Sequence, residues 1–314
     1  MPGKRPTEIG RRAFILGAAA LTAGCFRGGP TGRLRLAAGD PGGLYLAFAE
    51  ILAKQMKVRH PEIAVEVLPT EGTVENLGRL RTGDVDMGLA LADVAERDRA
   101  TGSAGDAPEA VARVYENYLQ VIVREDAAVQ QISDLQAQRV SIGPRGSGAA
   151  ATSRVLFEAA GLHMGVDVLN YRLKEGLARL ADGGIDALVW SGGVPTPAVA
   201  ELDGGVPLRM LDIGGVSVPM SRLAGYPYVV RLVPTCEDVP PGIKSIGVPD
   251  LLLCRRGIGA DVVAAVVDVL ATDAPQLVPP YVRGLQYLDA PSMIQTGLIP
   301  LNSGAVDAYR KLHG

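Results

Sequence analysis

The 314-residue chain contains few of the residues that build metal centres. It has only three cysteines, Cys25, Cys236 and Cys254, and three histidines, at positions 60, 163 and 313. Zinc sites use Cys and His at short, regular spacing, and no such spacing occurs here. The sequence therefore predicts no metal site and gives no indication of a cofactor. An oxidising compartment would permit a disulfide between Cys236 and Cys254, but Cys254 follows an apolar run and is equally typical of a buried thiol.

Aromatic residues are also scarce, at 4% of the chain with a single tryptophan, and they form no strip alternating with Lys and Arg. Grooves that bind single-stranded nucleic acid combine stacking aromatics with basic residues. The formal net charge of −3 gives no support to binding of a phosphate backbone either. We therefore expect no nucleic acid partner.

Recognisable catalytic motifs are missing. Ser147 lies in G-S-G, not in the G-x-S-x-G of a nucleophile elbow, and no histidine stands in a comparable turn after a strand. The glycine-rich turns contain neither the Lys-Ser/Thr ending of a P-loop nor a G-x-G-x-x-G sequence. We expect no catalytic residue, which favours a binding function. The alternative, an exported α/β hydrolase or transferase acting on a small carboxylate, would require a nucleophile–base pair.

The first 25 residues are predicted to be a signal peptide outside the fold. Arg11-Arg12 resembles a twin-arginine export signal, and it precedes a short apolar run and Thr22-Ala23-Gly24-Cys25. The latter resembles a lipoprotein cleavage site, which predicts extracytoplasmic anchoring through an acylated Cys25; a plain signal peptide cut nearby is the alternative. The apolar run is shorter than the about 20 residues that span a membrane. Residues 26–32 are then a linker, and loss of the segment's net +3 changes the formal charge from −3 to −6.

Three glycine-rich turns, at residues 38–43, 70–77 and 142–148, each connect a predicted strand to a predicted helix. Apolar residues alternate or run together before each turn and recur at helical spacing after it. Such helices point their unpaired N–H groups and positive dipole ends towards the ends of parallel strands. This arrangement favours a carboxylate or another anion as ligand.

Several side chains near these turns have two interpretations each. Thr73 and Asn76 either contact the ligand or form a capping box with Thr73 as the N-cap. Asp93 either accepts a hydrogen bond from the ligand or caps the following helix. Tyr45 and Trp190 either wall the cleft or pack in the core.

Five stretches together resemble a known family, the TAXI-type solute-binding receptors that serve tripartite ATP-independent periplasmic (TRAP) transporters. They follow the family order from about residue 33 to the end of the chain. The stretches are A-G-D-P-G-G-L-Y at 38–45, E-G-T-V-E-N-L at 71–77, G-D-V-D-M-G-L-A-L-A-D-V at 83–94, I-S-D-L-Q-A-Q-R-V-S-I-G-P-R-G-S-G at 132–148 and G-G-V-P-T-P-A at 192–198.

The resemblance implies the α/β fold of a type II periplasmic binding protein, with two lobes joined by crossover strands. It also implies a small organic anion as ligand, such as an amino acid or keto acid, and delivery to TRAP-type membrane transporter subunits. Under this resemblance the predicted ligand-binding residues are Gly43, Tyr45, Thr73, Asn76, Asp93, Arg145, Ser147, Gly148, Ala149, Trp190, Gly192 and Gly193.

Three positions depart from the family pattern. Leu91 replaces a common Gln, Ala149 replaces a common Thr, and Arg145 stands where the residue is more often apolar. Losing an amide and a hydroxyl while gaining a guanidinium predicts a changed ligand preference. Arg145 beside a helix N-terminus would hold a carboxylate through two parallel hydrogen bonds; a solvated loop arginine is the alternative.

Alternating strand and helix patterns predict two lobes. Lobe I is predicted to be discontinuous, with residues 33–120 and 220–314, and lobe II to contain residues 121–219. Parallel strands covered by helices are expected within each lobe. The sequences G-D-V-D-M-G-L-A at 83–90 and G-G-I-D-A-L-V-W at 183–190 are alike, which predicts equivalent turns in two lobes of related topology.

Overall fold

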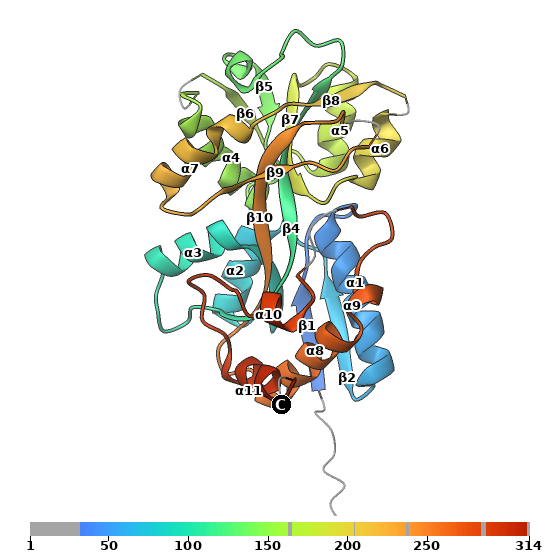
Figure 1. Cartoon of the computed structure of the whole chain (residues 1–314), viewed down its shortest axis with the longest axis vertical. Helices are drawn as coiled ribbons and strands as arrows, with labels where there is room; N and C mark the ends of the chain where they lie inside the picture. The colour runs from blue at the N-terminus through green and yellow to red at the C-terminus, as the bar shows by residue number, and fades with distance from the viewer. Residues whose placement is uncertain (1–31, 163–164, 204, 237–238, 284–286, 313–314) are drawn as a thin grey trace, which may run out of the picture.

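Figure 1 shows the computed structural model of the chain, which describes residues 32–162, 165–203, 205–236, 239–283 and 287–312. Two α/β lobes lie one above the other, joined by the long antiparallel strands β4 (Glu109–Arg124) and β10 (Lys244–Cys254). The predicted fold, two α/β lobes joined by crossover strands, is confirmed. The predicted export signal at Arg11-Arg12, the predicted lipidation site Cys25 and the linker up to residue 31 lie outside the described residues.

The lower lobe in Figure 1, which we call lobe I, contains the first helices of the chain and the last ones. Its second helix ends at Thr82, just before Gly83, because this glycine adopts a left-handed conformation with φ of 78°. The elements are β1 (Gly32–Ala37), α1 (Leu44–Arg59), β2 (Ile63–Leu68), α2 (Thr73–Thr82), β3 (Met87–Leu91), α3 (Ala92–Thr101), α8 (Ala260–Thr272), α9 (Ala274–Leu277), α10 (Ala290–Met293) and α11 (Ser303–Leu312).

The upper lobe, lobe II, contains the middle of the chain. Its elements are the 3₁₀ helix η1 (Ile132–Leu135), β5 (Arg139–Ser141), α4 (Gly148–Ala159), β6 (Asp167–Leu169), α5 (Leu173–Ala181), β7 (Ala187–Gly192), α6 (Pro197–Asp203), β8 (Leu208–Met210), the 3₁₀ helix η2 (Gly214–Val216), α7 (Ser217–Ala224) and β9 (Val229–Leu232).

One sheet runs through both lobes in the order β2-β1-β3-β10-β4-β7-β5-β6, with β8 beside β4 and β9 beside β10. Strand β1 is parallel to β2 and β3, and β5 is parallel to β6 and β7, as expected for each lobe. Because each helix follows a parallel strand, the helices that begin after β1, β2 and β5 point their N-termini towards the region between the lobes.

The two lobes share a brace that ties a strand to the turn after a helix. In lobe I the backbone N–H of Arg35 donates to the Asp86 carboxylate at 2.9 Å, and in lobe II that of Arg139 donates to Asp186 at 2.8 Å. Each guanidinium also donates to the glycine carbonyl three residues before its aspartate, at 2.8 and 2.9 Å. The predicted equivalence of the two turns is confirmed.

Strand β4 is longer than the largely apolar run at residues 119–123. It begins ten residues earlier, at Glu109, and includes charged residues that hide the strand pattern. One of these, Glu116, is 2% exposed and is paired with Arg231 at 2.6 Å and with the Tyr287 hydroxyl at 2.7 Å. The charge is tolerated because the neighbouring segments supply its partners. The predicted lobe boundary at residues 120 and 121 falls within this strand.

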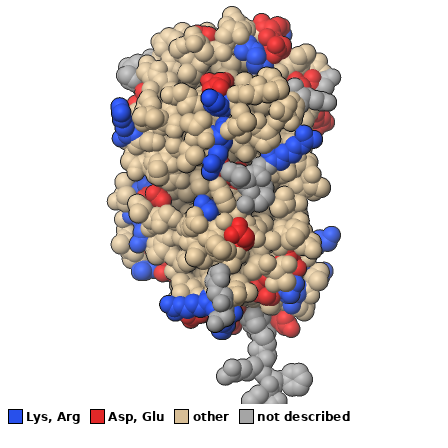
Figure 2. Space-filling model, viewed as in Figure 1, with Lys and Arg blue, Asp and Glu red and all other residues tan. Residues whose placement is uncertain are grey.

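The face of the molecule shown in Figure 2 carries Lys and Arg interspersed with Asp and Glu, without a continuous patch of one sign. Within the described ranges no helix combines the length and the apolar character needed to cross a bilayer. The same residues contain no group of three or more His, Cys, Asp or Glu side chains placed to hold a metal ion.

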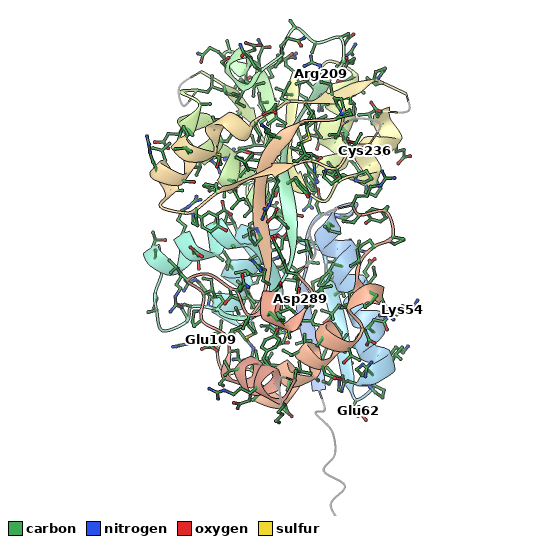
Figure 3. All side chains as sticks on the ribbon, in the orientation of Figure 1. Lys54, Glu62, Glu109, Arg209, Cys236 and Asp289 are labelled. Carbon is green, nitrogen blue, oxygen red and sulfur yellow. The ribbon has the colours of Figure 1, made fainter. Side chains whose placement is uncertain are left out.

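No disulfide joins Cys236 and Cys254 in the described structure. Cys254 pairs with Glu109 in the sheet, and Figure 3 shows Glu109 and Cys236 in opposite lobes. A disulfide requires the two Cα atoms to lie within about 7 Å. Of the two interpretations of Cys254, the buried thiol is the one observed, and burial raises its pKa to about 12.

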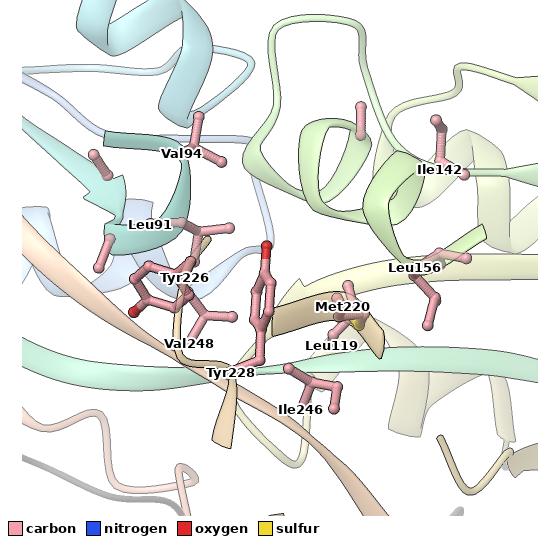
Figure 4. Packing of buried hydrophobic residues seen from close by; sticks show 14 of the residues in the cluster. Leu91, Val94, Leu119, Ile142, Leu156, Met220, Tyr226, Tyr228, Ile246 and Val248 are labelled. Atoms are coloured by element: carbon pink, nitrogen blue, oxygen red, sulfur yellow. The ribbon is translucent and has the colours of Figure 1, made fainter. Parts of the chain in front are cut away.

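Apolar packing continues from one lobe into the other beside the crossover strands. Figure 4 shows Leu91 and Val94 of lobe I near Tyr228, with Ile142 and Leu156 of lobe II on its other side. All five side chains are less than 9% exposed. The two lobes are therefore in direct contact, as in the closed form of a two-lobed binding protein.

Candidate ligand-binding site

A small cavity lies between the lobes, where the ends of β1, β3 and β7 meet the starts of α1, α2 and α4. About 40 Å³ is open to the centres of water-sized atoms, which is room for roughly three water molecules. The lining residues are Gly39, Asp40, Gly43, Leu44, Tyr45, Glu71, Gly72, Thr73, Leu91, Asn117, Ser147, Gly148, Ala149, Trp190 and Ser191.

Two helices open into this cavity with unpaired backbone N–H groups. Helix α1 follows Gly43, which has no side chain to cap it, so the N–H groups of Leu44 and Tyr45 have no acceptor among the described residues. Helix α4 is capped by Ser147, whose hydroxyl accepts from the N–H of Ala150 at 3.0 Å. The first N–H groups of α4 at residues 148 and 149 stay unpaired in the described structure. These groups supply hydrogen-bond donors and positive dipole ends for an anion.

Close approach of the lobes requires a glycine at the start of α4. A Cβ atom at Gly148 would lie 2.6 Å from Leu91 Cδ1 and 2.7 Å from Thr73 Oγ1, both across the cleft. Thr73 is itself fixed, since its hydroxyl accepts from the Leu91 N–H at 3.1 Å and lies 3.3 Å from the Tyr45 hydroxyl. Thr73 therefore forms part of the cavity wall. It does not cap α2, because the N-cap of this helix is Gly72.

Helices α2 and α5 are capped from the opposite lobe. The carbonyl of Gly146 in lobe II accepts from the N–H groups of Val74 and Glu75 in α2, at 3.0 and 3.1 Å. In the same contact the N–H of Gly146 donates to the Glu71 carboxylate at 2.8 Å. These bonds join the lobes at one edge of the cavity.

A second cross-lobe contact involves Asp40, which lies in lobe I. Its carboxylate accepts from the N–H of Leu173, the first residue of α5, at 2.9 Å and from the Arg172 guanidinium at 2.8 Å. Asp40 is buried, whereas the Arg172 side chain is 52% exposed, so the bond to the helix N-terminus is the better shielded one.

Asp93 forms a third contact between the lobes. Its carboxylate accepts from the hydroxyls of Thr152 and Tyr228, both at 2.8 Å. The side chain is fully buried, and burial raises the pKa of this carboxyl above its ordinary value. Asp93 does not line the cavity, so it is not placed as a ligand contact, and it does not cap α3. Its role in the structure is to hold α3 of lobe I against lobe II.

Most of the predicted ligand-binding residues are brought together. Gly43, Tyr45, Thr73, Ser147, Gly148, Ala149 and Trp190 line the cavity. The predicted Gly192 and Gly193 lie beside it, and their carbonyls accept from the Gln120 side chain at 3.2 and 3.3 Å. For Trp190 both interpretations hold, because it lines the cavity and packs with the apolar core of lobe II.

Asn76 does not line the cavity. It is fully buried, and its amide donates to the carbonyls of Ala38 and Leu89 at 2.7 and 2.8 Å while accepting from the Thr70 hydroxyl at 2.7 Å. All of its main hydrogen-bonding directions are used within lobe I. The structure thus gives Asn76 the role of a brace between α2 and the ends of β1 and β3, neither a cap nor a ligand contact.

Arg145 lies outside the cavity as well. Its side chain is exposed in the turn before α4, and no described residue forms an ion pair with it. The charged residues that do line the cavity, Asp40 and Glu71, are both acidic. In this closed arrangement an anion would meet backbone N–H groups and not a guanidinium.

Three residues that matter in the structure were not predicted. Asp40 stands within the first glycine-rich turn, and Glu71 within the second. Asn117 is one of the polar residues that interrupt the apolar strand β4, and it is 2% exposed. No sequence signal marks Asn117, because the charged residues around it hide this part of the strand.

The cavity contains no nucleophile paired with a base among the described residues. The Ser147 hydroxyl donates to the Pro144 carbonyl at 2.7 Å while capping α4, so both of its roles are structural. No histidine lines the cavity. The arrangement is suited to holding a small molecule by hydrogen bonds between two lobes.

Residues 36–311 match the NMT1-like family over most of the chain. The chain belongs to the NMT1-like family. The glycine-rich turns and both crossover strands of this NMT1-like chain lie within the matched residues.

Solved structures share the fold at low sequence identity. The periplasmic binding protein BugD aligns with a TM-score of 0.57 and 16% identity, over 80% of this chain and 84% of BugD. Tv2483 bound to L-arginine aligns with a TM-score of 0.53 and 14% identity, over 82% and 93% of the two chains. Rpa4515 of R. palustris with adipate aligns with a TM-score of 0.53 and 15% identity, over 78% and 85%. At such identities the likeness concerns the fold of the NMT1-like chain.

Proposed function

We propose that this protein is an extracytoplasmic solute-binding receptor that captures a small organic anion between its lobes and delivers it to a TRAP-type membrane transporter. The observation that carries the proposal is the cavity between the lobes, into which the unpaired N–H groups of α1 and α4 open. Backbone N–H groups at two helix N-termini bind an anion without a counter-ion from a side chain.

The solved structures of the same fold support a binding function. One of them is a periplasmic binding protein, and two others hold L-arginine and adipate, which both carry carboxylates. The TAXI-type sequence motifs support the membrane partner, and Arg11-Arg12 with Cys25 support export and lipid anchoring. The alternative of an exported hydrolase or transferase is disfavoured because the cavity brings no nucleophile and base together.

The proposal is tested by a thermal-shift screen of small carboxylates, sulfonates and neutral analogues, followed by calorimetry. A ligand that binds only the folded protein raises its melting temperature by mass action. We expect carboxylates to bind and to remain unchanged after prolonged incubation. Absence of binding by every acid, or product formation at a catalytic rate, would overturn the proposal.

Two variants decide how the anion is held. Ala149→Glu places a carboxylate at the open start of α4, and we expect it to abolish binding of acids by charge repulsion and occupied space.

Arg145→Ala tests the guanidinium contact predicted from sequence. Because Arg145 is exposed and the cavity is lined without it, we expect less than about a threefold change in affinity, below about 0.7 kcal/mol. A loss of tenfold or more would assign the anion contact to Arg145.

Anchoring is tested independently of the ligand. Expression with a labelled fatty acid in a bacterial host should label the wild type and leave Cys25→Ser unlabelled. Equal labelling of both would refute the lipid anchor and leave the binding function untouched.

A further inference from the structure

Asp250 is a fully buried carboxyl group that lies one hydrogen bond away from the cavity. Its side chain is 0% exposed, and in the sheet it stands between Leu91 of β3 and Tyr115 of β4. It does not line the cavity, but Tyr45 and Asn117, which do, both bond to it. Any charge on Asp250 therefore acts on a ligand from the layer directly below the cavity.

The two oxygens of this carboxyl are in different environments. Oδ1 accepts from the Tyr45 hydroxyl at 2.5 Å and from the Asn117 amide at 3.3 Å. Oδ2 is buried and has no hydrogen-bond partner among the described residues. An ionised carboxylate would leave a negatively charged oxygen buried without a donor, whereas a protonated carboxyl carries no charge there.

The charged groups around Asp250 do not favour its ionised form. Burial raises the pKa of its carboxyl well above the ordinary value, and the acidic Glu116 and Asp93 raise it further. The cations beside these two acids are already engaged, since Arg231 pairs with Glu116 at 2.6 Å and Arg97 lies 3.8 Å from Asp93. A buried carboxyl without a cation of its own takes up a proton instead of keeping its charge.

An anion in the cavity favours the same neutral form. The cavity is already lined by two acidic side chains, Asp40 and Glu71, which are bound to backbone N–H groups of the opposite lobe. A third negative charge directly below the ligand would repel an acid, and a neutral carboxyl would not. Two further polar groups are buried without a partner in the described structure, the Tyr115 hydroxyl and the Trp190 indole N–H, and both are uncharged.

We infer that Asp250 keeps a proton in the closed protein, and that it is the positioning residue that holds Tyr45 and Asn117 beneath the anion without opposing its charge. The proton is on Oδ2, because Oδ1 accepts both hydrogen bonds. The positioning role rests on the proposed function, since it assumes an anion in the cavity. The protonation can be measured without a ligand, so the two fail separately.

The protonation is tested by infrared difference spectroscopy, because the carbonyl stretch of a protonated carboxyl is separate from the bands of a carboxylate. At about pH 7 we expect this band in the wild type and its loss in Asp250→Asn, which keeps the shape of the side chain and carries no charge. Asp93→Asn changes a second fully buried carboxyl with a raised pKa and is the matched control. It should retain the band that Asp250→Asn loses. If Asp250→Asn removes no such band, the inference is overturned and the proposed function stands.

The positioning role is tested by calorimetry with propionate, glutarate and 2-oxoglutarate, and with propionamide as the neutral control. At about pH 7 we expect Asp250→Asn to bind the acids within about threefold of the wild type, because it imitates the protonated carboxyl. If Asp250 were ionised, removing its charge would tighten the acids about tenfold or more and leave propionamide unchanged, which would overturn the inference. Asp250→Leu removes the acceptor of both hydrogen bonds, and we expect it to weaken the acids about tenfold or more. Acid binding equal to that of the wild type would overturn the positioning role.

A pH profile separates this role from a purely structural one. A group with a raised pKa keeps its proton at low pH and loses it as the pH rises. At the pH where the infrared band of the wild type disappears, we expect the wild type to bind the acids about tenfold more weakly than Asp250→Asn does. An equal fall in both proteins, or equal weakening of the acids and propionamide, would show that Asp250 only supports the fold. No binding by any acid would overturn the proposed function and the positioning role, and the infrared result would still decide the protonation.

Discussion

Among the helices that begin in the region between the lobes, α1, α2, α4 and α5 fall into two pairs. Helices α2 and α5 are capped from the opposite lobe, α2 by the Gly146 carbonyl and α5 by the Asp40 carboxylate. Helices α1 and α4 keep unpaired N–H groups that open into the cavity. The N–H groups at a helix N-terminus therefore bind the opposite lobe in α2 and α5, and they are available to a ligand in α1 and α4.

The difference shows that a glycine-rich turn before a helix does not by itself make a ligand site. What decides its role is whether the other lobe reaches the helix N-terminus. The caps on α2 and α5 exist only while the lobes are in contact, because each donor and acceptor belongs to a different lobe. We therefore expect damage to the capped pair to weaken closure and damage to the open pair to act on the ligand directly.

The largest effect is expected for Asp40→Ala. The variant removes the buried cap of α5, and a hydrogen bond to a charged group contributes about 1.5–3 kcal/mol. We expect ligand affinity to fall roughly 10- to 100-fold, measured by calorimetry, and the ligand-bound particle to stay more open by X-ray scattering.

The matched control is Arg172→Gln. It removes only the half-exposed ion pair with Asp40, and exposed pairs contribute about 0–1 kcal/mol. Equal losses in both variants would show that the ion pair and not the cap of α5 holds the lobes together.

A smaller effect, about tenfold in affinity, is expected for Gly146→Ala. The added Cβ would lie 2.7 Å from the Glu71 carboxylate and 3.2–3.3 Å from the Cβ atoms of Glu71 and Glu75. The Glu71 carboxylate would have to leave the Gly146 N–H, and the two segments would have to move apart by a few tenths of an ångström. Gly78→Ala is the control, since its Cβ meets no atom within 4 Å and Ala favours the same helix α2. Unchanged affinity in Gly146→Ala would mean that the cap on α2 tolerates this shift.

Ser147→Ala sharpens the comparison on the open side. It deletes the hydroxyl that caps Ala150, and loss of an N-cap costs about 1 kcal/mol of stability. The N–H groups at residues 148 and 149 are unaffected. We expect a lower free energy of unfolding in urea and less than about a threefold change in affinity, under about 0.7 kcal/mol. A large loss of affinity with unchanged stability would make Ser147 a ligand contact, as predicted from the sequence.

The sequence predicted the frame of the site well because glycine-rich turns and strand periodicity are local signals. The turns at 83–90 and 183–190 were recognised as equivalent, and both hold a strand through the same kind of Arg–Asp brace. Seven of the predicted ligand-binding residues line the cavity, all of them in or next to such turns or at the end of β7.

The roles of single polar residues were not predictable in the same way. Asn76 and Asp93 both stand near a helix start, and both are used up by partners distant in sequence: Ala38 for Asn76, and Thr152 and Tyr228 for Asp93. Such contacts depend on how the strands and lobes are arranged, which periodicity does not show. The exposure of Arg145 could not be predicted for the same reason, because the direction of a loop side chain depends on the tertiary structure.

The last prediction concerns Asp93, the cross-lobe carboxylate that accepts hydrogen bonds from two hydroxyls of lobe II. Burial raises its pKa in the folded protein above the ordinary value of about 3.9. The folded state therefore keeps a proton that the unfolded chain has released, and the contribution of Asp93 to stability falls as pH rises from about 4 through the raised pKa. Asp93→Asn retains an oxygen acceptor for Thr152 and Tyr228 but carries no charge.

We expect the stability of Asp93→Asn relative to the wild type to increase between about pH 4 and pH 7, measured by urea unfolding at each pH. Tyr228→Phe is the opposing control, because it removes a hydrogen bond that favours the charged carboxylate and so lowers stability most at high pH. A difference between Asp93→Asn and the wild type that is constant with pH would show that Asp93 has the same pKa in both states. A difference that shrinks as pH rises would show that the two hydroxyls outweigh burial, and that Asp93 closes the lobes in its charged form.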